Sequence, residues 1–119
     1  MKVTFAARRA GDFQVLRSNW IADYLDPATF LEVFRGDSGN NYTRWSNQAY
    51  DAALFSAART ADPAARLELF QRAEAILLEE APIIPIYHYT HVFLVQPTVK
   101  GWHPTLLDHH PYKHVWLEK

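Results

Sequence analysis

The clearest pattern of hydrophobic and polar positions lies between residues 62 and 80. Apolar residues recur there at helical spacing, and the charged residues Arg66, Glu68, Arg72 and Glu79 lie mostly outside that stripe. The apolar stripe is formed by Leu69, Ala73, Ile76 and Leu77. This periodicity predicts an amphipathic helix. Asp62-Pro63 supplies a start signal, because aspartate accepts hydrogen bonds from first-turn amides and proline fits the first helical position. Ala81-Pro82 ends the helix.

Two further helices are predicted upstream by similar signals. Asp26-Pro27 begins the first, which we expect to run to about Phe34. Ser46 can cap the second, which we expect to run to about Arg59. The stripe expected on this second helix consists of Tyr50, Leu54, Ala57 and Ala58. A segment rich in glycine and asparagine lies between the two helices and predicts a loop.

The strands are predicted by β-branched and aromatic residues. Residues 83–95 are apolar on both alternations, which is typical of a strand covered on both faces. Pro85 within this run implies a bulge or an unpaired edge position. Short strands are also expected at residues 1–9, 13–16 and 115–117. Three helices and these strands predict a mixed α/β fold.

Composition limits the classes of function. The 119 residues are 49% hydrophobic, which fits one ordinary soluble domain. A net charge of −1 supplies no basic field for nucleic acid or an anionic membrane. The absence of cysteine excludes disulfides, thiolate zinc sites and cysteine nucleophiles. The first apolar run is too short for a signal peptide, so the chain as written is expected to be neither exported nor membrane-spanning.

Six histidines raise the question of a metal site. His88 and His91 are three positions apart on a predicted strand and therefore point to opposite faces. His109, His110 and His114 lie in a proline-bearing segment without a carboxylate pattern. We therefore expect no metal site and no cofactor. No nucleophile-elbow serine, zinc-protease or phosphate-loop motif occurs, so the chain is not expected to be an enzyme.

The carboxylate of Asp23 has no evident structural role. Asp23 lies just ahead of a helix whose cap is already supplied by Asp26. It could be a surface aspartate paired with Arg17 or hydrogen-bonded to backbone amides. Alternatively, a carboxylate beside Trp20 and Tyr24 in a partly desolvated cleft could recognise a cation.

Five sequence blocks follow one another along the chain in a recognisable order. They are GDF-x6-W-x-x-DY-x-DP-x-x-FL (residues 11–31), NNY (40–42), WSNQAYDA (45–52), APIIPIYHYTHVFLVQPTVKGW (81–102) and HPYKHVWLEK. Over essentially the whole chain, this order resembles the C-terminal part of the extracytoplasmic oligopeptide/dipeptide-binding proteins of ABC transporters, solute-binding protein family 5. The resemblance implies part of a two-lobed periplasmic-binding-protein type II fold that closes on a peptide. Residues 1–101 would be a partial second lobe with three main helices and a mixed sheet. Residues 102–119 would be a tail that crosses back to the first lobe.

The implied function is capture of peptides by their α-ammonium and backbone for an ABC import system. The full-length protein would be periplasmic or extracytoplasmic and would partner a transporter permease. Other members of the family bind nickel complexes, haem or sugars. The alternative is a self-standing interaction module that has lost ligand binding. Because the chain supplies few elements to cover residues 83–95, we also expect a homo-oligomer or a swapped dimer.

The resemblance assigns roles to four residues. Asp23 would bind the peptide's α-ammonium, and Trp20 would wall a side-chain pocket. Arg17 matches a residue that binds the peptide carboxylate in some oligopeptide binders. Tyr89 matches a strand tyrosine that approaches the ligand. Recognition of termini and backbone suits a binder that must accept many side chains.

Overall fold

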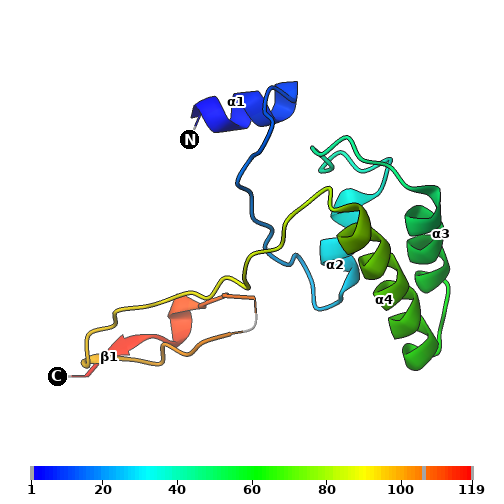
Figure 1. Cartoon of the computed structure of the whole chain (residues 1–119). Coiled ribbons are helices and arrows are strands. Elements are labelled where there is room, and N and C mark those ends of the chain that lie inside the picture. The colour runs from blue at the N-terminus through cyan, green and yellow to red at the C-terminus, as the bar shows by residue number, and fades with distance from the viewer. Residues whose placement is uncertain (1, 106, 119) are drawn as a thin grey trace. The chain divides into compact units, whose positions relative to one another are not determined.

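The computed structural model describes residues 2–105 and 107–118. The chain divides into two compact units, Met1–Pro85 and Ile86–Lys119. Helices make up the first unit, and a short hairpin lies in the second (Figure 1). The boundary expected between residues 101 and 102 concerns the lobes of a longer protein and stays a prediction.

The core of the first unit is formed by two packed helices, α3 (Gln48–Ala57) and α4 (Pro63–Glu80). They lie side by side (Figure 1). Their buried residues are Tyr50, Ala53, Leu54 and Ala57 on α3, and Phe70, Ala73 and Leu77 on α4. Leu69 and Ile76 are partly buried against this cluster. The predicted stripe of α4 is therefore confirmed, with Phe70 as an additional member.

The helix ends follow their local capping chemistry. Asp62 accepts a hydrogen bond from the Ala65 amide at 2.8 Å, which confirms the predicted start of α4. The predicted cap of α3 is wrong, because Asn47 and not Ser46 accepts from the Tyr50 amide, at 3.0 Å. The side-chain amide of Asn47 also donates to Glu80 at 2.6 Å. This second bond holds Asn47 in the capping position. Helix α3 ends two residues earlier than expected, and Ala58 is exposed.

The predicted helix after Asp26-Pro27 is confirmed as α2 (Ala28–Leu31) followed by the 3-10 helix η1 (Glu32–Phe34). Ala28 belongs to the core cluster shared with α3 and α4. The Tyr50 hydroxyl, on a fully buried residue, donates to the Leu31 carbonyl at 2.6 Å. Burial raises the pKa of Tyr50 above its ordinary value, so the phenol stays a neutral donor. This bond joins α2 to the α3/α4 pair.

The strand expected at residues 1–9 is wrong, because α1 (Lys2–Ala10) occupies this region. Alanine and arginine favour a helix, and the Arg8 guanidinium lies 5.0 Å from the Phe5 ring centre, one turn away. Arg44 donates to the Ala10 carbonyl at 2.8 Å after the last turn. Local helix preference therefore outweighs the β-branched residues. Met1 lies outside the described residues.

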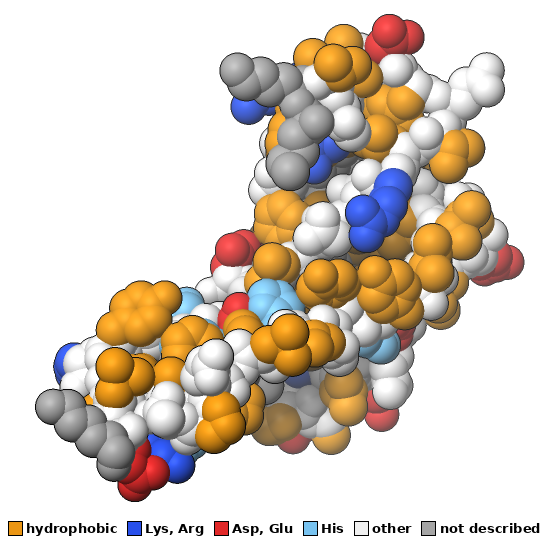
Figure 2. Space-filling model, turned by 90° about the vertical axis from the view of Figure 1, so that its left-hand side faces the viewer, with side chains coloured by type: hydrophobic (Ala, Val, Ile, Leu, Met, Phe, Trp, Pro, Cys, Tyr) orange, Lys and Arg blue, Asp and Glu red, His pale blue; other side chains and the backbone are white. Residues whose placement is uncertain are grey.

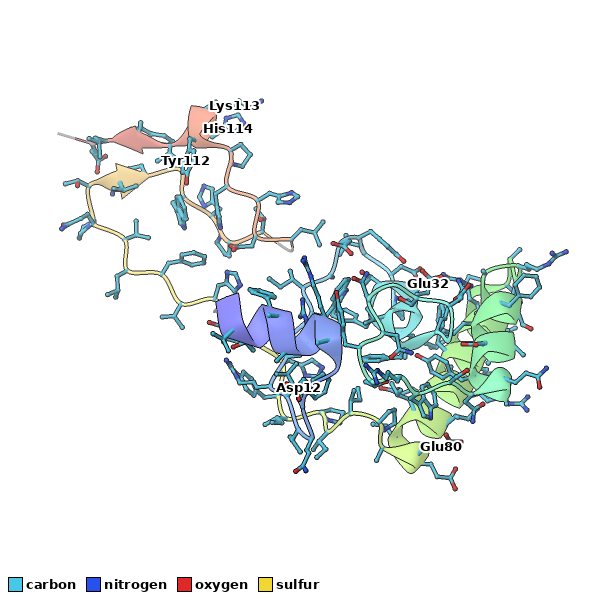
Figure 3. The ribbon with its side chains drawn as sticks, turned by 90° about the horizontal axis from the view of Figure 1, so that it is seen from above. Asp12, Glu32, Glu80, Tyr112, Lys113 and His114 are labelled. Atoms are coloured by element: carbon cyan, nitrogen blue, oxygen red, sulfur yellow. The ribbon has the colours of Figure 1, made fainter. Side chains whose placement is uncertain are left out.

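The second unit contains a two-stranded antiparallel hairpin of β1 (Val99–Lys100) and β2 (Trp116–Leu117). Val99 pairs with Leu117. The 3-10 helix η2 (Tyr112–His114) precedes β2 (Figure 3). The predicted last strand is confirmed in its final two residues. Leu106 and Lys119 lie outside the described residues.

Two other predicted strands are wrong. Within the described residues, neither 13–16 nor 83–95 pairs with another strand. Residues 83–95 follow an irregular path and are not covered on both faces: Ile86 is 82% exposed and Leu94 fully exposed. A strand is stable only where its backbone N–H and C=O groups form hydrogen bonds with neighbouring strands. Figure 2 shows many hydrophobic side chains on one face of the molecule. No helix among the described residues is long and apolar enough to cross a membrane.

Candidate ligand-binding site

The backbone of Asp23 is fastened to the first unit by a buried threonine. The Asp23 amide donates to Thr29 Oγ1 at 3.0 Å. Thr29 lies on α2 and is only 4% exposed, so its hydroxyl is held by the packing of that helix. This bond fixes the turn ahead of α2 at the position of Asp23 and leaves its side chain free of capping duty.

Asp26 performs the capping that Asp23 does not. Its Oδ1 accepts from the Ala28 amide at 2.9 Å. Both its oxygens accept from Arg66 of α4, at 2.6 and 2.8 Å. The hydrogen bonds from the Arg66 guanidinium hold the pKa of Asp26 below its ordinary value. The bidentate pair therefore fastens the start of α2 to α4, as expected of planar guanidinium–carboxylate geometry.

The Asp23 side chain is exposed. Among the described residues, its carboxylate accepts no hydrogen bond and forms no ion pair. The pairing with Arg17 considered from the sequence is therefore not formed, and Arg17 is itself exposed. A carboxylate with a fixed backbone and a free side chain is available to a cation from outside the chain.

Aromatic side chains and a further carboxylate occur on both sides of Asp23 along the chain. Trp20 is 38% exposed and Tyr24 is 44% exposed. The Tyr24 hydroxyl donates to Glu32 at 3.2 Å. Burial, and then the charge of Glu32, raise the pKa of Tyr24, with smaller contributions from Asp26 and Asp23. The surroundings of the Tyr24 hydroxyl are thus negatively charged, which suits a cationic ligand group.

The fourth predicted site residue lies in the second unit. Tyr89 is 66% exposed. Its ring packs edge-on against His91, with centroids 5.6 Å apart, and tilted against Tyr87 at 6.1 Å. Contacts between every second residue indicate an extended backbone here. The structure thus places Asp23 in the turn ahead of α2 and Trp20 three residues before it, both in the first unit, and places Tyr89 in the second.

One carboxylate is paired with two of the histidines, which was not foreseen from the sequence. Asp108 accepts from His110 Nε2 at 2.7 Å and also contacts Nδ1 of His91. The signal was present, since Asp108 directly precedes His109-His110. No group of three or more histidine, aspartate or glutamate residues in the described part of the chain is placed to hold a metal ion.

The ion pair of Asp26 predicts a pH-dependent contribution to stability. A carboxyl group whose pKa is lowered by folding stabilises the fold above its unfolded pKa of about 3.9, and this contribution disappears as pH falls through the folded value. We expect Asp26→Ala to lower the melting temperature of the chain at pH 7. Its difference from the unsubstituted chain should shrink as pH falls below about 4. Circular dichroism melts across pH check this.

Asp37→Ala is the matched control for that experiment. Asp37 also pairs with an arginine, Arg35, at 2.8 Å, but both side chains are exposed. Exposed pairs contribute little, so this substitution should leave the melting temperature almost unchanged at any pH. A pH-independent effect of Asp26→Ala would contradict the assigned role of its charge.

Comparisons of sequence relate the chain to periplasmic binding proteins. No protein-family model matches it. The probable deoxycholate-binding periplasmic protein YgiS of Escherichia coli is 42% identical over 101 residues, which cover 85% of this chain and 19% of that protein. The periplasmic murein peptide-binding protein MppA of Escherichia coli is 40% identical over 101 residues, covering 85% and 19%. The dipeptide-binding protein DppE of Bacillus subtilis is 37% identical over 115 residues, covering 94% and 20%.

Solved structures agree with the sequence comparisons. The murein tripeptide-binding protein MppA of Escherichia coli matches with a TM-score of 0.93 at 35% identity, over 99% of this chain and 23% of that one. OppA of Haemophilus influenzae, in complex with the peptide RPPGFSPFR, matches with a TM-score of 0.91 at 34% identity, over the same shares. The chain thus spans about a fifth of the length of the curated relatives it matches. These relatives are binding proteins and not enzymes.

Proposed function

The chain is a homologue of the C-terminal segment of the periplasmic oligopeptide- and dipeptide-binding proteins, and from this premise we propose that it supplies the ammonium-binding wall of a peptide site. In the full-length protein, Asp23 receives the α-ammonium of a peptide. Trp20 walls a side-chain pocket, and Arg17 and Tyr89 approach other parts of the ligand. The complete protein captures peptides outside the cytoplasm and delivers them to the permease of an ABC importer.

The geometry of Asp23 is the observation that carries this proposal. Its backbone amide is tied to the buried Thr29, and its carboxylate is free of internal partners among the described residues. Every unblocked peptide carries an α-ammonium at its N-terminus, whatever its side chains. A charge-assisted hydrogen bond to a fixed carboxylate therefore gives affinity without reading the sequence of the peptide.

The relatives are named for different classes of ligand. MppA and DppE are named for peptides, whereas YgiS is named for deoxycholate. Deoxycholate is an anion, and the carboxylates of Glu32 and Asp23 near Tyr24 would repel it, whereas the charge of Asp26 is compensated by Arg66. The charges of this turn therefore favour a peptide with a free amine.

The test supplies the parts of the cleft that this chain does not contain. The chain replaces the matching segment of Escherichia coli MppA, and calorimetry compares a tripeptide, its N-acetylated form and deoxycholate. We expect binding of the free-amine peptide only. Equal affinity for the acetylated peptide would refute the ammonium site, and tight binding of deoxycholate would assign the segment to the other ligand class.

A second candidate function rests on the exposed residues 83–95. This segment contains no aspartate, glutamate, lysine or arginine, and its aliphatic side chains Ile84, Ile86, Val92 and Leu94 are all at least 78% exposed. Uncharged apolar segments with unpaired backbone groups associate with one another. We therefore propose that the chain by itself acts as an oligomerising module, by pairing this segment with that of a second copy.

Self-association gives a prediction of its own. Light scattering at micromolar concentration should show dimers or larger species for the chain. Ile86→Lys combined with Leu94→Lys should shift it toward monomer, because two buried charges would oppose pairing. Phe55→Lys is the control, since Phe55 is also exposed (64%) but lies on α3. A monodisperse monomer before any substitution would exclude the oligomerising module.

A further inference from the structure

Asp108 lies between two imidazole rings of the second unit. Its Oδ1 accepts from His110 Nε2 at 2.7 Å, and its Oδ2 contacts His91 Nδ1. A carboxylate accepts and does not donate, so each facing ring nitrogen carries a proton. One aspartate thereby joins residues on two separate segments, 86–95 and 102–110. Its charge is stabilised there, since the hydrogen bond from His110 lowers the pKa of Asp108.

The aromatic packing holds one end of this bridge in place. The His110 ring stacks on Trp102 with centroids 4.1 Å apart and planes 11° apart. Phe93 packs edge-on against both rings, at 5.3 and 5.7 Å. The His110 side chain is only 9% exposed. Asp108 therefore meets one partner that is fixed by packing.

The other end of the bridge reaches the candidate ligand-binding tyrosine. His91 is 37% exposed, so packing alone does not fix its ring. The centroid of the His91 ring lies 5.6 Å from that of Tyr89, with the two planes at 83°. It lies 6.0 Å from the centroid of Phe93. An aromatic ring prefers an edge-to-face neighbour, so the orientation of His91 decides where the Tyr89 ring packs.

Asp108 also has an unusual backbone for this role. Its φ is +57°, in the left-handed region that few residues other than glycine adopt. Aspartate tolerates this region better than most residues. The conformation turns the chain at the point where its carboxylate meets both rings.

We propose that Asp108 is a positioning residue for Tyr89: it fixes the tautomer and orientation of His91, whose ring in turn sets the place of the tyrosine ring. The role in ligand binding rests on the proposed function, whereas the chain of contacts does not. The relay runs from the packed Trp102–His110 stack through Asp108 and His91 to Tyr89.

Nuclear magnetic resonance of the 119-residue chain tests the relay directly. Long-range proton–nitrogen spectra at a pH of about 8, where histidine is ordinarily neutral, report which ring nitrogen carries the proton. We expect the Nδ1–H form for His91 and the Nε2–H form for His110. A nuclear Overhauser contact between the rings of His91 and Tyr89 should accompany them. His88, which makes no hydrogen bond with a described residue, is the internal reference.

Asp108→Asn is the decisive variant, because it keeps the shape of the side chain but offers one acceptor where the carboxylate offers two. At least one of the two imidazoles should then change its tautomer, and the contact between His91 and Tyr89 should weaken. Asp108→Ala should abolish that contact. Tyr89→Leu should leave both tautomers unchanged, since the relay runs toward the tyrosine. The amide signals of β1 and β2 report whether the hairpin stays folded.

The outcomes separate this inference from the proposed function. Unchanged tautomers and an unchanged His91–Tyr89 contact in both Asp108 variants would overturn the positioning role. Failure of the MppA chimera to bind peptides would refute the proposed function and leave the relay standing. In the chimera, Asp108→Asn should lower the affinity for the peptide. If adding Tyr89→Leu lowers it no further, the result would support both the positioning role and the proposed function.

Discussion

Replacing Asp23 by asparagine in the MppA chimera is expected to weaken binding of a free-amine peptide by about 30-fold to a few thousand-fold. Removing one partner of a buried charge pair costs about 2–5 kcal/mol, much of it because the other charge is left unpaired. The acetylated peptide, which has no ammonium and is not expected to bind either protein, gives the baseline. Calorimetric titration of both peptides into both proteins measures this difference.

The same substitution should have almost no effect on binding by the isolated chain. Asp23 is exposed there, and exposed ion pairs contribute about 0–1 kcal/mol. Asp37→Asn in the chimera is the matched control, because Asp37 is an exposed carboxylate of the same unit that already pairs with Arg35. Free-amine affinity that survives Asp23→Asn would remove Asp23 from the site.

Leu77→Ala is expected to remove much of the stability of the first unit. Leu77 is 3% exposed in the α3/α4 core, and truncating a buried leucine costs about 2–5 kcal/mol. Whole domains are stable by only about 5–15 kcal/mol. The melting temperature should therefore fall by about 10 °C or more. Thermal melts followed by the helical circular dichroism signal measure it.

The neighbouring leucine provides the control for this substitution. Leu78 lies on the same helix with the same side chain but is 48% exposed. Leu78→Ala keeps the helix propensity change identical while removing little buried surface. It should shift the melting temperature by a few degrees at most, corresponding to about 0.5 kcal/mol. Equal effects of the two substitutions would contradict the assignment of the α4 face.

Helices α2, α3 and α4 of the first unit were predictable because their signals are local, whereas α1 was wrongly predicted as a strand. Asp62-Pro63 caps α4 through an amide three residues away, and the stripe of α4 is set by helical spacing alone. The cap of α3 was predicted one residue too early, because Ser46 and Asn47 are both favoured cap residues and local preference does not choose between them. In the structure Asn47 also bonds to Glu80, far along the chain.

That Asp23 is not needed as a helix cap was also predictable, because this signal is local too. The redundancy of Asp23 follows from its distance to Asp26, and the structure agrees that Asp26 caps α2. The anchoring of Asp23 by Thr29 and the pairing of Asp26 with Arg66 involve side chains that only folding brings together. The bridge made by Asp108 was missed because one of its two histidines lies on another segment.

The family, the existence of helices α3 and α4 and the start of α4 could be predicted from the sequence, since each depends on residues within a turn or on the order of blocks along the chain. Only the tertiary structure showed that Asp26 is paired with Arg66 and that the Asp23 carboxylate has no partner among the described residues. It also decided that residues 83–95 stay unpaired and exposed, although their composition predicts a buried strand. Burial and strand pairing depend on what lies opposite a segment, and a hydrophobic pattern specifies only that a partner is needed.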